Sequence, residues 1–503
     1  MRLRTHSPAG RPLMAVTAAV LLVLGVFAAG QAWMARSRSI ERSVKPGSGS
    51  TAPIEASACD GTRLRPGDNL QAALSSHPAG ASFCFSRGVH RLAVPLTPKP
   101  RQRLIAWPGA VLSGARVVTE WERRGAAWRA TGQLPASPTT HGECAEGDGC
   151  RLAETVFYDD QRLRRVTRRA DVGPGRFYAD YPGNAIWVGD DPSGHVVEVA
   201  RAEAAVAGKA EGVLVDGFVI ERFANPAQRG AVHALGPGWQ IQRNEIRFNH
   251  GVGLYSVSAR VLGNHVHHNG QLGLGGGGND QLVEGNEIDH NNTAGFSMLW
   301  EAGGAKWARS VGLVVRGNTV HHNQGPGLWT DINNIETLYQ DNVVHANASH
   351  GIFHEISYRA VIRNNRVTDN GRAQPLAGWG GAGICVAGSP DVEVYGNIVS
   401  GNENAIMLVQ QVRTDWPSAH GPHQLEDVVV HDNDITMSSK LTGIVDDTGE
   451  ATVFQRNNRF EGNTYRLSSA NGRYFAWQGQ QWDRTAWTGR FGQDTTGQFL
   501  GLP

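Results

Sequence analysis

Two neighbouring segments of the chain repeat one short pattern, in which a glycine and an apolar residue precede an aromatic residue and, two places later, an acid. The first segment is GLWTD, with Trp329 and Asp331, and the second is GIFHE, with Phe353 and Glu355. Two carboxyl groups about 5 Å apart can break a glycosidic bond, because one gives a proton while the other serves as nucleophile or base. Flat aromatic rings beside them can stack on sugar rings. The pattern therefore predicts a catalytic pair, Asp331 and Glu355, if the fold brings the two segments side by side.

An asparagine repeat supplies elements that can do so. Pairs of asparagines five residues apart recur with a basic unit of about 22 residues. Each unit places aliphatic residues at the same positions relative to its asparagines, so we expect stacked coils of three short strands, as in a parallel β-helix. The asparagine fits a turn position that tolerates left-handed backbone and hydrogen-bonds along the stack. The pairs are Asn244/Asn249, Asn264/Asn269, Asn286/Asn291, Asn318/Asn323, Asn342/Asn347, Asn365/Asn370 and Asn397/Asn402.

The same repeat carries a resemblance to a known family. The segments GNHVHHNGQLGL, GNTVHHNQGPGL and DNVVHANASHGI resemble the right-handed parallel β-helix proteins of the pectate-lyase-like superfamily. The resemblance covers about residues 212 to 437 and extends less closely to residues 58 to 115. It implies an all-β solenoid and a polysaccharide substrate, but not a reaction, because the family includes lyases, glycoside hydrolases, epimerases and tail spikes. The chain has no match to the aspartate-rich calcium cluster of pectate lyases, so no catalytic residue is carried over.

The remaining segments are arranged around the repeat. Arginines precede an uncharged apolar run from residue 13 to residue 30, which indicates a secretion signal or a membrane anchor. A segment rich in Ser, Pro and Gly follows as a linker, and the aromatic C-terminal segment leaves the repeat and is interpreted as a cap on the open sheet edge. The predicted parts are 1–34, signal or anchor; 35–57, linker; 58–115, entry of the β-helix; 116–202, inserted β-rich subdomain; 203–440, β-helix; and 441–503, C-terminal cap.

Composition and cysteine usage set the expected environment and partners. Lys+Arg (47) nearly balances Asp+Glu (46), which gives no electrostatic reason to expect nucleic acid. In an exported chain Cys59 pairs most simply with Cys84, and Cys144 with Cys150, which leaves Cys385 as a structural thiol. We expect an extracytoplasmic monomer, membrane-anchored or secreted, that meets the membrane only through its N-terminal segment. No cofactor motif is present, although Ca²⁺ binding by the acidic pair stays open as an alternative to catalysis.

Register predicts where the acids lie. Four positions beyond the glycine that follows the second asparagine, adjacent coils carry Asp331 and Glu355, and other coils carry Val257, Gly277, Leu299, Ala387 and Val409. Side chains alternate along a strand, so the two aromatics and two acids should share one solvent-facing strip. Carboxylates in neighbouring strands repel each other, so we expect one of them to have a raised pKa. A separation of roughly 5 to 5.5 Å would suit a retaining glycosidase, and roughly 6.5 to 9.5 Å an inverting one.

Insertions in particular coils are expected to wall a cleft over this pair, because insertions in a solenoid collect on the binding face. The segment MLWEAGGAKWARS is read as an extra loop just beyond the strip, and Glu301 within it is the third catalytic candidate. Later insertions carry Trp379 and Trp416. For His354 a structural role is the favoured alternative to substrate contact. The residues predicted to bind substrate are Trp329, Phe353, Trp300, His354, Tyr358 and Lys306.

Histidines form a second column, three residues after the first asparagine. His267, His321 and His345 occupy it, with Asp289 in the coil between the first two, and further histidines follow one place later. Imidazoles in one column suit Zn or Cu. No spacing fixes a tetrahedral set, so the column is interpreted as a polar outer surface and no metal site is predicted.

Three functions are compatible with these features. Glycoside hydrolysis by Asp331 and Glu355, with Glu301 nearby, is favoured. A polysaccharide lyase or uronan epimerase needs a base and a cation for the uronate carboxylate, and Lys306 is the lysine near the expected cleft. The third alternative is a non-enzymatic solenoid that binds glycans at the cell surface.

Overall fold

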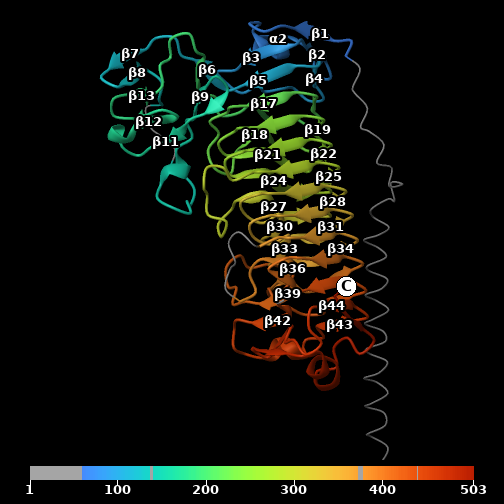
Figure 1. Cartoon of the computed structure of the whole chain (residues 1–503). Coiled ribbons are helices and arrows are strands. Elements are labelled where there is room, and N and C mark those ends of the chain that lie inside the picture. Colours follow the sequence, from blue (N-terminus) through green and yellow to red (C-terminus); the bar gives the residue numbers. More distant parts are fainter. Residues whose placement is uncertain (1–58, 136–139, 372–377, 439, 503) are drawn as a thin grey trace, which may run out of the picture. The chain divides into compact units, whose positions relative to one another are not determined.

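The computed structural model describes residues 59–135, 140–371, 378–438 and 440–502, so the predicted signal or anchor and the linker lie outside the described residues. Within that part of the chain no helix is both long enough and apolar enough to cross a membrane. The backbone winds through a stack of coils from β1 (Thr62–Leu64) to β47 (Gln498–Gly501), as Figure 1 shows.

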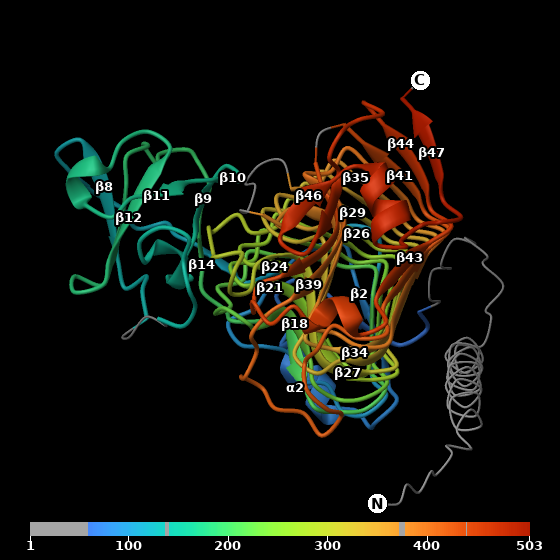
Figure 2. The same cartoon turned by 90° about the horizontal axis from the view of Figure 1, so that it is seen from below.

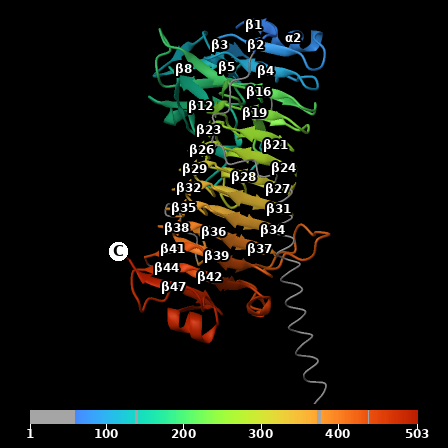
Figure 3. The same cartoon turned by 90° about the vertical axis from the view of Figure 1, so that its right-hand side faces the viewer.

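Each coil contributes three short strands. One coil has β20 (Glu245–Arg247), β21 (Val252–Val257) and β22 (Arg260–Leu262), and the next repeats them as β23 (His265–His267), β24 (Leu272–Asn279) and β25 (Leu282–Glu284). Each strand pairs in parallel with its counterpart one coil later. The first strand of each coil joins a 13-stranded sheet and the other two join a 25-stranded sheet. Figure 3 shows these rows of strands side by side. The predicted all-β parallel β-helix is confirmed.

Inside the stack, apolar residues and asparagines hold successive coils together. Ile246, Val266 and Ile288 lie at matching positions and are fully buried. Asn244 donates from Nδ2 to Oδ1 of Asn264 at 2.9 Å. The same bond continues along this row, the asparagine ladder, through Asn286, Asn318, Asn342, Asn365, Asn397, Asn433 and Asn463. The ladder ends where Asn463 donates to Oδ1 of Asp494 at 3.0 Å.

The asparagines themselves are not the left-handed residues of these turns, contrary to the expectation. The residue before each ladder asparagine has positive φ, for example Arg243 (55°), Gly263 (56°) and Asp341 (55°). The left-handed residue turns the chain, and the asparagine that follows is then free to bond along the stack.

One coil departs from the expected register. β24 pairs with β27 (Gly303–Val311) so that Leu274 faces Ala305, which makes Gly304, not Gly295, the register glycine of that coil. The insertion therefore lies before the strand, over residues 292–302, and Ala308 rather than Leu299 pairs with Asp331. Asn292 stabilises the inserted loop, since its side chain both donates to and accepts from the backbone of Phe296 at 2.9 Å.

The entry of the β-helix is covered by a short helix. The helix α2 (Leu70–Ser76) begins after Asn69, whose side chain accepts from the backbone nitrogen of Ala72. The predicted disulfide between Cys59 and Cys84 is confirmed and ties the start of the described chain to β2 (Ser82–Phe85).

The inserted β-rich subdomain has two sheets of its own, one of four strands and one of five. It runs from β6 (Ala115–Val117) to β14 (Val197–Ala200), and Phe177, Ile186 and Val199 lie in its separate core. In Figure 2 strands β8 (Ala127–Thr131) and β12 (Arg176–Asp180) lie outside the ring of coils. The predicted disulfide Cys144–Cys150 is confirmed here. The backbone of Cys144 also forms an isolated antiparallel β-bridge with Phe296 on the inserted loop.

At the other end, aromatic residues close the last coils. Trp487 is fully buried and packs on Phe460, Phe475 and Trp477. Two antiparallel strands, β45 (Phe475–Trp477) and β46 (Gln480–Trp482), add the only reversed pairing of the 25-stranded sheet within the described residues. The tryptophans of this segment are packing residues, as the sequence indicates.

Candidate functional site

The two predicted acids occupy the same place on adjacent rungs. Asp331 ends β30 (Leu328–Asp331) and Glu355 ends β33 (Ile352–Glu355). These strands pair in parallel with Trp329 opposite Phe353. In this register the two carboxyl groups project from strands about 4.8 Å apart. The sequence therefore placed the pair correctly.

The strip that carries them is not open to solvent, which corrects the expectation. Trp329, Asp331, Phe353 and Glu355 are only 4%, 7%, 6% and 4% exposed. They line a cavity of about 560 Å³, whose walls also contain side chains of three insertions, Trp300, Trp379 and Arg413. The acids lie on the outer face of the β-helix, but the insertions cover that face.

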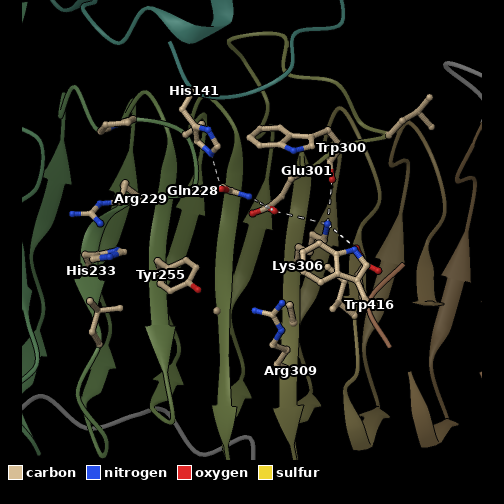
Figure 4. A pocket seen from close by; sticks show the side chains of 18 of the residues that line it. His141, Gln228, Arg229, His233, Tyr255, Trp300, Glu301, Lys306, Arg309 and Trp416 are labelled. Atoms are coloured by element: carbon tan, nitrogen blue, oxygen red, sulfur yellow. Dashed lines mark hydrogen bonds and ion pairs between the residues drawn. The ribbon is translucent and has the colours of Figure 1, made fainter. Parts of the chain in front are cut away.

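A second cavity of about 920 Å³ adjoins the first, because Leu299, Trp300 and Asp331 line both. Figure 4 shows this larger cavity over β18 (Gly230–Ala234), β21, β24 and β27. Glu301 and Lys306 line it, so the structure brings the third acid candidate next to the predicted pair. Trp416, which is 48% exposed, also faces this cavity.

Lys306 is not in a loop, contrary to the expectation, but on β27, one rung before Trp329. Its ammonium nitrogen lies 2.9 Å from Oδ2 of Asp331 and 3.8 Å from Oε2 of Glu301. Glu301 also accepts a hydrogen bond from Gln228 at 2.8 Å, as Figure 4 shows. One lysine therefore links two of the three candidate acids.

The aromatic pair is stacked along the β-helix rather than presented to a sugar. The rings of Trp329 and Phe353 are 5.6 Å apart and 18° from parallel, and Lys306 Nζ lies 3.9 Å from the Trp329 ring centre. Because Lys306 comes from the preceding rung and Phe353 from the following one, both faces of the indole contact protein. Trp300, Trp379 and Trp416, on the insertions, also line the cavities and add aromatic rings that can contact a ligand.

The two carboxylates have different surroundings. Glu355 accepts from Trp329 Nε1 at 3.1 Å through Oε2, and its Oε1 forms an ion pair with Arg413. Asp331 binds Lys306 through Oδ2, whereas its buried Oδ1 has no hydrogen-bond partner among the described residues. Each acid has a cation of its own, so the mutual repulsion expected from the sequence is offset.

His354 does not contact the cavity, which corrects its inclusion among the substrate-binding residues. It is fully buried, and its Nδ1 lies 2.8 Å from Thr330 Oγ1, to which the Tyr339 hydroxyl donates at 3.0 Å. Alternation along β33 turns Phe353 and Glu355 outward and therefore turns His354 inward. Burial lowers the pKa of His354 to about 3, so the ring is neutral at ordinary pH.

Tyr358 also lies away from both cavities, although it was predicted to bind substrate. It begins β34 (Tyr358–Arg363), beyond the turn that follows Glu355, and lines neither cavity. Its hydroxyl donates to the carbonyl of Gly421 at 2.7 Å, and its ring packs against His420 and His423. Tyr358 therefore anchors the insertion that carries Arg413 and Trp416.

Several residues of the larger cavity are absent from the sequence prediction, among them Arg229, His233, Tyr255 and Arg309. His233 pairs with Tyr255, Tyr255 with Gly275, and Gly275 with Lys306, so this column leads directly to Trp329 and Phe353. Part of the signal was present in the sequence, because Tyr255 and Lys306 hold the position two beyond the register glycines Gly253 and Gly304, whereas in the coil of His233 an alanine, Ala231, replaces the glycine. Burial, with a contribution from Arg229, lowers the pKa of His233 to about 4.

Fold and comparisons together define the class of protein: the chain is a right-handed parallel β-helix protein. The family model described as right handed beta helix region matches residues 230–381. Comparison with curated protein sequences finds no match.

Among solved structures, the complex of XylC with xylose is similar at 15% identity and a TM-score of 0.62, over 86% of this chain and 82% of that one. The A-module of the mannuronan C-5 epimerase AlgE6 from Azotobacter vinelandii is 15% identical with a TM-score of 0.43, over 86% and 93%. A GH87 α-1,3-glucanase from Streptomyces thermodiastaticus is 10% identical with a TM-score of 0.42, over 90% and 69%. At these identities the likeness to XylC shows the fold, and the two lower scores add nothing further.

Proposed function

We propose that this chain is a carbohydrate-active enzyme that hydrolyses a glycosidic bond with Asp331 and Glu355. The observation that carries the proposal is their placement at one position of adjacent rungs, inside a cavity walled by insertions. A spacing of about 4.8 Å between neighbouring strands is compatible with the carboxyl separation of about 5 to 5.5 Å that suits a retaining mechanism. XylC, whose structure contains xylose, has the same fold and adds support for a sugar ligand.

Asp331 is the better nucleophile of the two. Lys306 holds its Oδ2 in an ion pair, while Oδ1 has no hydrogen-bond partner among the described residues and is free to attack. In a retaining mechanism this oxygen bonds to the anomeric carbon as the bond to the leaving oxygen breaks. Water then releases the sugar and regenerates the carboxylate.

Glu355 is the proton donor in this scheme. Donation requires the protonated acid, whereas Arg413 favours the carboxylate. Arg413 lies beyond the end of β39 (Asn404–Gln410), on the inserted segment. We therefore infer that a bound sugar displaces the guanidinium group from Glu355, which lets the acid take up the proton that it gives to the leaving oxygen.

A second candidate, proton abstraction beside a uronate carboxylate, gains support from the larger cavity. Arg229 and Arg309 line it together with His233 and Tyr255. A lyase or epimerase needs a cation for the carboxylate and a base for the proton, and these side chains are of the required types. From the sequence, Lys306 was the lysine expected near the cleft, and the positions of these two arginines beside it were not predicted.

One experiment separates the candidates and tests the site. The full-length chain is incubated with neutral and uronate-containing polysaccharides, and new reducing ends and ultraviolet-absorbing unsaturated products are measured in parallel. Hydrolysis releases reducing ends without absorbance, and a lyase produces both. Asp331→Asn and Glu355→Gln should each remove hydrolysis, and Asp341→Asn, which changes an acid that lies between them in the sequence but outside both cavities, should not. Full hydrolysis by both site variants would refute the proposal.

A further inference from the structure

A cluster of histidines and acids lies on the outer face of the 13-stranded sheet, away from both cavities. His267 on β23 pairs with Asp289 on β26 (Glu287–Asp289), and Asp289 pairs with His321 on β29 (Thr319–His321). None of these residues lines either cavity. Figure 3 shows β23, β26 and β29 in one row of adjacent strands. The cluster is therefore a feature that the proposed hydrolysis does not use.

Asp289 is the centre of the cluster. It is only 6% exposed, and its two oxygens face two imidazoles: Oδ1 lies 2.7 Å from His265 Nε2, and Oδ2 lies 2.6 Å from His290 Nδ1. Ligand atoms of Asp289, His290 and His321 all lie within 4.8 Å of one another, as do those of His265, Glu287 and Asp289. Two triads of metal-ligand type thus share one buried carboxylate.

Ring stacking along the coils orients the imidazoles. His290 lies between His268 and His322, with ring centres 5.0 and 5.1 Å away and ring planes 6° and 3° from parallel. His321 stacks on His345 at 4.9 Å and 13°. Rings held in this way need little rearrangement to bind an ion, which favours binding.

We propose that Asp289, His290 and His321 bind a divalent transition-metal ion of the Zn²⁺ or Cu²⁺ type. Two imidazoles and one carboxylate are a ligand set suited to these ions, whereas Ca²⁺ and Mg²⁺ prefer oxygen ligands. His290 is half exposed, so water can reach a remaining coordination position. The ion would join the coil of Asp289 to the next coil through His321, in addition to the backbone ladder between them.

The alternative is that the column is held only by hydrogen bonds between histidines and acids. His431 provides a matched control, because it also lies between two acids, at 3.0 Å from Glu393 and 2.7 Å from Asp432. Those three residues do not form a compact triad of ligand atoms like the two around Asp289. Metal binding should therefore depend on the Asp289 cluster and not on His431.

The test uses the full-length chain with a purification tag that contains no histidine. Zn²⁺ is titrated by calorimetry, and Cu²⁺ is added for paramagnetic resonance, which reports nitrogen ligands. We expect one tight site in the wild type and in His431→Ala, and affinity at least about 10-fold lower in Asp289→Asn and His321→Ala. Circular dichroism without metal shows whether each variant is folded.

The two hypotheses give opposite results. A folded wild type that binds neither ion at one equivalent, or folded Asp289→Asn and His321→Ala variants that bind as tightly as the wild type, would overturn the metal site. Glycan cleavage by these variants is expected to equal that of the wild type, so the result does not depend on the proposed hydrolysis.

Discussion

The ammonium nitrogen of Lys306 lies 2.9 Å from Oδ2 of Asp331, and this ion pair joins two adjacent rungs of the β-helix. Both side chains are buried, with 7% of each residue exposed. Removing one partner of a buried ion pair leaves an uncompensated charge, which is strongly unfavourable. The pair thus holds the Asp331 side chain in one orientation, in which Oδ1 has no hydrogen-bond partner among the described residues.

Replacing Lys306 by Met should therefore reduce catalysis more than it reduces folding. Met fills a similar volume over the Trp329 ring but cannot hold Asp331. We expect kcat to fall by about 10²-fold or more, since the carboxylate loses both its charge partner and its orientation. An unchanged kcat in a glycan-cleavage assay would mean that Lys306 is structural only.

Replacing Arg413 by Gln tests the inference that substrate displaces this side chain from Glu355. Without the guanidinium group no ion pair has to be broken before Glu355 gives its proton to the leaving oxygen, so catalysis no longer depends on displacement of this side chain. Cleavage near neutral pH should be retained. Arg456→Gln, which removes an arginine that bonds to Gln410 outside both cavities, is the control. Loss of all activity in Arg413→Gln would instead assign Arg413 to substrate binding or catalysis.

The asparagine ladder should be a major source of stability. Asn342 donates from Nδ2 to Val315 O and to Asn365 Oδ1 at 2.9 Å, and its Oδ1 accepts two bonds from Asn318 at 3.0 Å. Asn342→Ala leaves these buried groups unpaired, at a cost of about 3 kcal/mol in the free energy of unfolding. Asn279→Ala, at an exposed position, should cost less than about 0.5 kcal/mol. Equal denaturation midpoints for the two variants would contradict this role.

Buried neutral histidines should make the fold less stable in acid. Burial lowers the pKa of His354 to about 3 and that of His350 to about 4, both below the value in an unfolded chain. Between those values and about pH 6.5 the unfolded state binds more protons, so stability is complete above about pH 6.5 and falls as the pH decreases. Each histidine should contribute a slope of up to about 1.4 kcal/mol per pH unit.

Urea denaturation at pH 7 and pH 5 measures this slope. His354→Gln should reduce the difference between the two pH values, whereas His77→Gln, at a partly exposed site, should leave it unchanged. A His354→Gln variant with the full pH dependence of the wild type would show that the loss of stability in acid arises elsewhere.

The fold and the position of the acid pair could be predicted from the sequence for one physical reason. Coils that stack in register repeat the same residue at the same place, so the asparagines report the register of Asp331 and Glu355 directly. The register could not be predicted in the coil where two glycines, Gly295 and Gly304, both precede apolar residues, because only strand pairing shows that Gly304 is the register residue. The contact of Arg413 with Glu355 could not be predicted either, because Arg413 lies on an insertion and insertions have no periodic pattern.

The residue that ends the asparagine ladder gives the stack a direction. Every ladder asparagine donates its amide forward to the next coil, so the last member must accept and has nothing ahead to receive a donor. Asp494 meets this requirement, since its carboxylate accepts from Asn463, from the Tyr465 hydroxyl at 2.6 Å and from Trp487 Nε1 at 3.3 Å, and has no amide of its own to leave unpaired. The aspartate therefore closes this row of side-chain hydrogen bonds with an acceptor alone, and no buried amide group is left without a partner at the last coil.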